Sequence, residues 1–118
     1  MITLVDIKRD IVERKEKYFR NYLYWCKKIK NKAIKVLGKD VKVLVFGSIV
    51  KGNWTPNSDI DVLIISKNLN KNWFENTPIK LKIKKAVGLF SPFQIHLATP
   101  LEYKNWYKKF IKKDYIEV

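Results

Sequence analysis

One stretch of the chain constrains the fold more than any other, because it joins two apolar runs through a glycine-bearing turn and ends on two acids. It runs from Phe46 to Asp61, after the apolar run 41–46 and before the apolar run 62–65. Short runs rich in Val, Leu and Ile, bounded by turn residues, are typical of buried β-strands. The sequence therefore predicts a turn and two carboxylates at one end of a β-sheet.

Gly47 and Ser48 have the residue types of an anion-binding turn. Glycine lets the chain turn sharply at a strand end and lets a ligand approach the backbone closely. Ser48 can cap a short helix over about 49–52, whose free N–H groups would favour an anion. Phosphate is the obvious candidate.

Asp59 and Asp61 have the spacing of a cation site. Residues i and i+2 of a strand project from one face, so both carboxylates point the same way while Ile60 and Val62 point the other way. Two carboxylates this close repel each other, and a hard divalent cation such as Mg²⁺ relieves the repulsion. Either half of the pattern alone would also fit an ordinary turn or a solvent-exposed strand end.

Together these residues resemble a family signature. Gly47-Ser48, Gly52 and Ser58-Asp59-Ile60-Asp61 are spaced as in the polymerase-β-like nucleotidyltransferase superfamily, in particular its small minimal nucleotidyltransferases (MNT), and the end of the chain is similar to small archaeal members. The resemblance implies an α+β (α/β two-layer) nucleotidyltransferase fold. It implies a short mixed β-sheet of about three strands, a long N-terminal helix, and further helices on one side.

The resemblance also implies residue roles. In that family the Gly-Ser pair binds the β- and γ-phosphates of an NTP, and two strand aspartates hold two Mg²⁺ or Mn²⁺ ions with a third carboxylate from a neighbouring strand. Asp59 and Asp61 are thus the expected catalytic and metal-binding residues. The expected nucleotide-binding residues are Gly47, Ser48, Lys51, Gly52 and Ser58. Lys51 fits a solubilising surface lysine equally well.

The third carboxylate is missing from its expected strand, 92–98. The face that should meet the aspartates offers Gln94 and His96 instead. Gln94 is the candidate third metal ligand, but its amide brings no negative charge, so the second ion would be held more weakly. His96 fits either a contact to the metal site or a structural role.

The remaining sequence predicts a single nucleotidyltransferase domain over 1–118. Segment 1–38 has apolar residues at helical spacing, which predicts one long helix or two helices with a bend. Segment 41–98 is expected to contain the sheet and the active site. Segment 99–118 is expected to form a C-terminal helix. A further helix is expected to begin at Thr77-Pro78. Trp54 can either stack on a nucleobase or hold its own loop. Trp73-Phe74 should anchor the loop that precedes it. The aromatic stripe of the C-terminal helix, which includes Trp106, should lie in the core or in an interface.

Composition excludes several classes of site. One cysteine and one histidine exclude an internal disulfide, a cysteine-cluster zinc site and a multi-histidine metal site. No apolar run approaches the roughly 20 residues that cross a membrane, so a soluble, cytoplasmic protein is expected. The net charge of +14 would attract an NTP, a nucleic acid or an acidic partner, but it also suits a heat-adapted surface.

Three functions follow from these observations. The first is a metal-dependent nucleotidyltransferase that moves AMP from ATP to a hydroxyl acceptor, with a partner protein among the candidate acceptors. The second is an antitoxin-type interaction protein of an MNT/HEPN pair, with a weakened or vestigial site. The third is a basic nucleic-acid-binding module. The long first helix predicts a homodimer or a hetero-complex with a helical HEPN-type partner.

Overall fold

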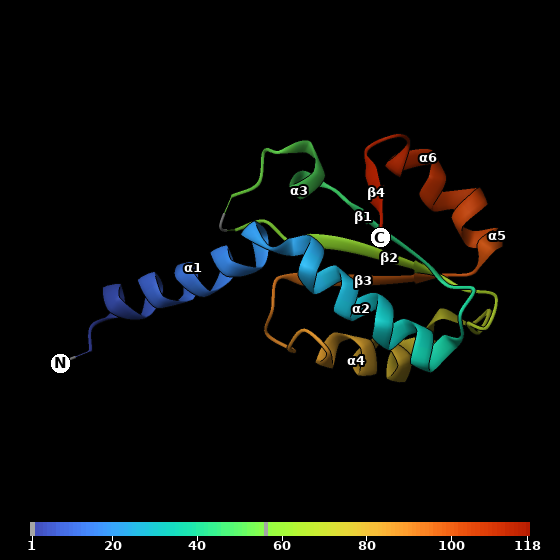
Figure 1. Ribbon diagram of the computed structural model, residues 1–118, viewed down its shortest axis with the longest axis horizontal. Helices are drawn as coiled ribbons and strands as arrows, with labels where there is room; N and C mark the ends of the chain where they lie inside the picture. Colours follow the sequence, from blue (N-terminus) through green and yellow to red (C-terminus); the bar gives the residue numbers. More distant parts are fainter. Residues whose placement is uncertain (1, 56) are drawn as a thin grey trace.

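A four-stranded mixed sheet forms the centre of the protein (Figure 1). The computed structural model describes residues 2–55 and 57–118, and all of their side chains except those of residues 10–12, 14 and 110. The sheet has the order β3-β2-β1-β4, with β3 parallel to β2 and the other pairs antiparallel. The strands are β1 (Lys42–Phe46), β2 (Ile60–Ile65), β3 (Phe93–Ala98) and β4 (Tyr115–Glu117). The sequence predicted the mixed sheet with about three strands, and the fourth strand is an addition.

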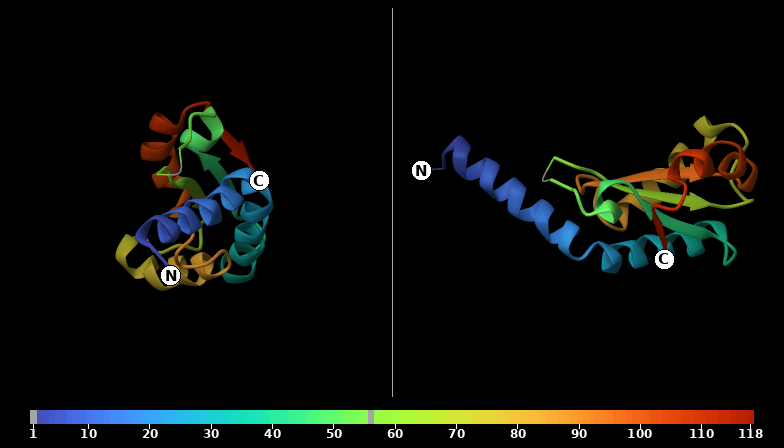
Figure 2. Two further views of the ribbon diagram at one scale, coloured as in Figure 1. Left: turned by 90° about the vertical axis from the view of Figure 1, so that its left-hand side faces the viewer. Right: turned by 90° about the horizontal axis from the view of Figure 1, so that it is seen from above.

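The N-terminal segment forms two helices, α1 (Leu4–Arg20) and α2 (Tyr22–Leu37), with a bend at Asn21. Helix α2 lies along the sheet, whereas the first turns of α1 project away from the body, as Figure 1 and the right-hand view of Figure 2 show. The C-terminal end of α1 is anchored by Phe19, which is buried. The predicted helical segment is thus confirmed in its two-helix form.

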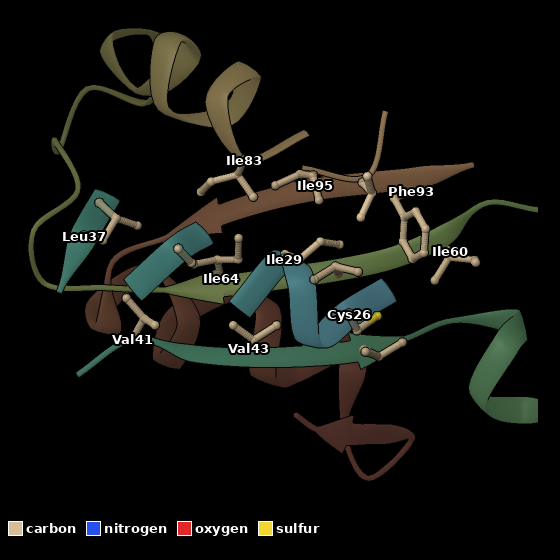
Figure 3. Close-up of a cluster of buried hydrophobic side chains, with 14 of the residues drawn as sticks. Cys26, Ile29, Leu37, Val41, Val43, Ile60, Ile64, Ile83, Phe93 and Ile95 are labelled. Atoms are coloured by element: carbon tan, nitrogen blue, oxygen red, sulfur yellow. The ribbon is translucent and has the colours of Figure 1, made fainter. Parts of the chain in front are cut away.

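The larger core lies between one face of the sheet and the helices α2 and α4 (Thr77–Lys85) (Figure 3). Alternate residues of each strand enter it, while α2 contributes Cys26 and Ile29 and α4 contributes Ile83, all fully buried. Burial also raises the pKa of the Cys26 thiol to about 12, so this cysteine stays neutral and belongs to the core. The helix predicted from Thr77 is confirmed; a single 3₁₀ turn, η1 (Trp73–Asn76), precedes it.

The last helical segment covers the opposite face of the sheet, which corrects the prediction of helices on one side. It consists of α5 (Pro100–Glu102), a π-helical turn η2 (Tyr103–Tyr107) and α6 (Lys108–Ile111). Ile111 packs there with residues of β1, β2 and β3. Because the strands are apolar on both faces, both faces need cover. The predicted capping box is present, with Thr99 and Glu102 bonded reciprocally.

The C-terminal helix ends earlier than predicted. The segment 99–118 was expected to be helical throughout, but the helix stops at Ile111 and residues 115–117 form β4 against β1. Lys112 adopts a positive φ of 54°, which turns the chain back towards the sheet. The backbone N–H and C=O groups of β1 thereby gain partners on both sides, because β2 occupies its other edge.

A tight turn and a one-turn helix join β1 to the loop before β2. Gly47 has φ +88° and ψ −158°, a conformation that is almost exclusive to glycine, and α3 (Ser48–Lys51) follows it. An added Cβ at Gly47 would lie 2.6 Å from Oδ2 of Asp61. Gly52 ends α3 in the left-handed conformation, with φ +78°, and an added Cβ there would meet nothing within 4 Å.

No helix in the described ranges, 2–55 and 57–118, has the length and apolar character needed to cross a membrane.

The two glycines make a matched pair for a stability test. We expect Gly52→Ala to lower the free energy of unfolding by about 1 kcal/mol, the usual cost of a non-glycine residue in the left-handed region. Gly47→Ala should cost about 2 kcal/mol or more, because its conformation is more restricted and because the Asp61 carboxylate must move. Urea unfolding of both variants measures the difference.

A double-mutant cycle then isolates the carboxylate. In an Asp61→Ala background the cost of Gly47→Ala should fall, whereas the cost of Gly52→Ala should not change. An equal cost of Gly47→Ala in both backgrounds would show that the approach of Asp61 to Gly47 is not what requires glycine there.

Candidate active site

The pairing of β1, β2 and β3 brings the start of the Gly47 turn, Asp61 and Gln94 level with one another at one end of the sheet. Phe46, the last residue of β1, pairs with Asp61, so the Gly47 turn begins beside that aspartate. Ile60 and Val62 point into the larger core, as the alternation predicts, and Asp61 lies on the opposite face. Asp59 precedes β2 and is exposed.

Asp61 is held from two sides. Its Oδ2 faces Gly47, as the short distance to an added Cβ shows. Its Oδ1 lies 3.2 Å from Nε2 of His96, a distance at which the imidazole N–H donates to the carboxylate. Both side chains are about 30% exposed. The Oδ2 atom therefore stays directed at the glycine turn while Oδ1 is engaged by His96.

His96 is the residue whose role the sequence left open between a contact to the metal site and a structural one. Its ring lies between Phe46, at a centroid distance of 5.5 Å, and Tyr107, at 6.1 Å. These two rings orient the imidazole, and the imidazole orients Asp61. The signal in the sequence was the alternation of β3, which placed His96 on the aspartate face without identifying its partner. Its observed role is to position a site carboxylate.

Gln94 lies level with Asp61 in the parallel pairing of β2 and β3, and it is exposed. The register therefore agrees with the predicted alternation of β3. Among the described residues, no group of three or more His, Cys, Asp and Glu side chains is arranged to hold a metal ion. The protein donors at this end of the sheet are thus two carboxylates with one amide level with them.

That donor set suits a single hard cation better than two. Mg²⁺ is commonly bound through one or two carboxylates, with waters and substrate phosphates completing its shell. Asp59 and Asp61 fit that pattern. Two divalent ions bound by the protein alone would require more anionic ligands than these two carboxylates and Gln94 provide. A second ion is therefore expected only together with the phosphates of a nucleotide.

The predicted phosphate-binding residues occupy different positions around the short helix α3. Ser48 is the first residue of α3 rather than its cap, because Gly47 occupies the cap position. The N–H groups of Ser48 and Ile49, at the start of α3, have no acceptor within the helix itself. Lys51 is exposed at the end of α3, and Gly52 serves to end that helix.

The loop before Asp59 is organised by its own side chains. The Ser58 hydroxyl accepts a hydrogen bond from the Thr55 amide at 2.9 Å, so its visible role is to hold the loop. Trp54 stacks on Phe19 of α1, with ring centroids 4.7 Å apart and planes 2° from parallel. Of the two roles that the sequence allowed for Trp54, the structure shows the one that holds the loop.

Lys84 is a charged residue near the site that the sequence did not single out. Its ammonium donates to the backbone oxygen of Ser91 at 2.9 Å and to that of Phe93, which fixes the chain where β3 begins. Burial lowers the pKa of Lys84, and the negative charge of Asp59 opposes that shift. Lys84 thus places a positive charge within the field of Asp59.

Comparison with known proteins agrees with this geometry. Residues 26–118 match the nucleotidyltransferase domain family. A comparison with curated proteins gave no significant match. Two solved structures, both assigned provisionally as nucleotidyltransferases, share the fold. One is 33% identical, with a TM-score of 0.53 over 78% of this chain and 95% of its own. The other, from Sulfolobus solfataricus, is 18% identical, with a TM-score of 0.59 over 91% of this chain and 84% of its own.

The family match covers most of helix α2, the sheet, the Gly47 turn and both aspartates, which is most of the chain and all of the candidate site. The chain therefore belongs to the nucleotidyltransferase domain family.

Proposed function

We propose that the protein transfers a nucleoside monophosphate, AMP from ATP, to a hydroxyl acceptor and releases pyrophosphate, in a reaction that depends on Mg²⁺ or Mn²⁺. The observation that carries this proposal is the meeting of the Gly47 turn with Asp61, together with Asp59 two residues before it. A turn of the anion-binding type beside a carboxylate, with a second carboxylate two residues away in the chain, suits a nucleotide that arrives with a divalent cation.

Each group has a defined task in this reaction. Ser48 and the first amides of α3 would hold the leaving phosphates, with Lys51, Gly52 and Ser58 forming and flanking that loop. Asp59 and Asp61 would hold the metal, with Gln94 as a neutral neighbour. The metal, when bound, supplies charge neutralisation at the transferring phosphoryl group. In phosphoryl-type transfer the protein forms few or no covalent bonds to the substrate. The main contribution of these residues is therefore to position the nucleotide and the acceptor.

His96 has a positioning role in this proposal. Its contact with Oδ1 leaves Oδ2 of Asp61 directed towards the Gly47 turn, where the phosphates would lie. A carboxylate fixed in this way loses less conformational freedom when a cation binds. Because Gln94, level with Asp61, brings no negative charge, a second metal ion would be held more weakly and would activate the acceptor hydroxyl less, so a slow enzyme is expected.

We expect MgATP to raise the melting temperature of the protein. A ligand that binds only the native state at about 100 times its dissociation constant adds about 2.7 kcal/mol to the free energy of unfolding, which corresponds to a shift of several degrees. The shift should be smaller with ATP and EDTA, and smaller again in Ser48→Ala. It should be lost in Asp59→Asn and in Asp61→Asn.

Asp40→Asn is the matched control for the charge. Asp40 is an exposed aspartate paired with Lys67 at the opposite end of β1, so its loss should leave the MgATP shift intact. An equal shift in the wild type and in both site variants would place the nucleotide elsewhere and contradict the proposal.

A second proposal concerns an interaction surface, which the projecting half of α1 favours. Leu4 and Val5 are 77% and 65% exposed, and Phe90 in the loop before β3 is 99% exposed. A hollow of about 680 Å³ lies between the C-terminal half of α1 and that loop, lined by Tyr18 and Trp25 among others. Phe90 lines this hollow, whereas Leu4 and Val5 lie on the first turns of the same helix α1. Exposed apolar residues beside a hollow mark interaction sites more often than isolated ones do. We propose that this surface binds a second copy of the chain or a helical HEPN-type partner, as the antitoxin function would require.

The interface proposal predicts a specific pattern of variants. The chain should form a dimer in light scattering, or a stable complex when it is co-expressed with a HEPN-type protein. Val5→Glu combined with Phe90→Glu should abolish the assembly, whereas Leu81→Glu, at an exposed leucine of α4, should leave it intact. A monomer at high concentration, with no complex on co-expression, would contradict this proposal. A nucleic-acid-binding role has no support in the described part of the chain beyond the net charge.

A further inference from the structure

A second hollow adjoins the candidate active site at the β3 edge of the sheet. Its volume is about 680 Å³, within the range of small-molecule sites. It lies between the η1 turn with the start of α4 on one side and α5 with η2 on the other, and residues His96 and Leu97 of β3 form its floor. It thus opens beyond the strand that carries Gln94 and His96.

His96 links this hollow to the site. The same imidazole that contacts Oδ1 of Asp61 lines the hollow. From β1 to β3, the order across the sheet is the Gly47 turn, Asp61, His96 and then the hollow. A ligand whose phosphates lie at the Gly47 turn and beside Asp61 would reach this hollow with the part that extends past β3.

Two tryptophans give the hollow its chemical character. Trp73 on η1 and Trp106 on η2 both line it, and they are 74% and 67% exposed. Neither belongs to a core cluster, so the prediction that Trp73 anchors its loop is wrong. Leu69 and Asn76 hold that loop instead, because both are buried and the Asn76 amide exchanges hydrogen bonds with the backbone of Asn70.

The backbone at Trp106 is unusual as well. Residues Tyr103–Tyr107 form a π-helical turn, and such turns occur frequently at functional sites. The turn places Asn105 and Trp106 in the lining of the hollow, where Lys80 from α4 and Glu102 from α5 add charges of opposite sign. A planar ring that can stack on indole and accept or donate hydrogen bonds at its edge fits these side chains.

We propose that this hollow binds the base and sugar of the nucleotide, with the base stacked on Trp106 or Trp73. The inference rests on the proposed function, since it assumes that the phosphates occupy the Gly47 turn. It adds a nucleoside-binding site on η1 and η2, outside the Gly-Ser turn and the aspartates. It also gives a reason for two exposed tryptophans beside an active site.

The test separates the base from the phosphates by using two ligands. Isothermal titration with MgATP and with magnesium tripolyphosphate, which has no nucleoside, compares the wild type with Trp106→Ala, Trp73→Ala and Ser48→Ala. At least one tryptophan variant should bind MgATP about tenfold more weakly, because stacking of a base on an aromatic ring is lost. Neither tryptophan variant should change the affinity for tripolyphosphate. Ser48→Ala should weaken the binding of both ligands.

Two controls sharpen the result. Tyr24→Ala removes an exposed aromatic ring of α2 outside the hollow and should change neither affinity. Phe in place of the critical tryptophan keeps a ring and should restore most of the MgATP affinity. Unchanged MgATP binding in both tryptophan variants, with weakened binding in Ser48→Ala, would overturn the nucleoside site and leave the proposed function standing. Failure of the wild type to bind either ligand would overturn both.

Discussion

The parallel pairing of β2 with β3 determines the geometry of the site. It sets Asp61 level with Gln94 and brings His96 within 3.2 Å of the Asp61 carboxylate. Because side chains alternate along a strand, a shift of one residue in this register would move Gln94 and His96 to the core face. The apolar residues Phe93 and Ile95, which are almost fully buried between the sheet and its helices, prevent that shift. Core packing thus fixes the site.

The sequence predicted the elements around the signature well, because local patterns determine them. Turn residues and apolar alternation located β1, β2 and β3, and the end signals at Thr77 and at Thr99 located two helices. The alternation also placed Ile60 and Val62 in the core and Asp61 on the other face. These features depend on neighbours in the chain, so a single sequence contains them.

Features that depend on distant residues were not predictable in the same way. Strand β4 forms by pairing with the edge of β1 that β2 leaves free. The local sequence of residues 115–117 does not predict that pairing. The position of α5 to α6 on the second face follows from strands that are apolar on both sides, which short buried runs leave ambiguous. The contact of His96 with Asp61 and the hollow beside it required the three-dimensional arrangement.

The charge distribution of the protein agrees with a site that binds an anionic nucleotide through a divalent cation. The chain carries a net charge of +14, yet Asp61 and, two residues earlier, Asp59 lie at the start of one strand. A positive body draws a nucleotide towards the protein, whereas the carboxylates would repel its phosphates unless a divalent cation lies between them. Metal binding at Asp59 and Asp61 is therefore the central claim, and nucleotide binding follows from it.

The most direct measurement of that claim is the number of Mn²⁺ ions bound per chain, obtained by electron paramagnetic resonance in the presence of a saturating non-hydrolysable ATP analogue. The account predicts at least one bound ion in the wild type and in Asp40→Asn, and its loss or marked weakening in both Asp59→Asn and Asp61→Asn. The same number of ions bound with the same affinity in Asp61→Asn as in the wild type would contradict the account.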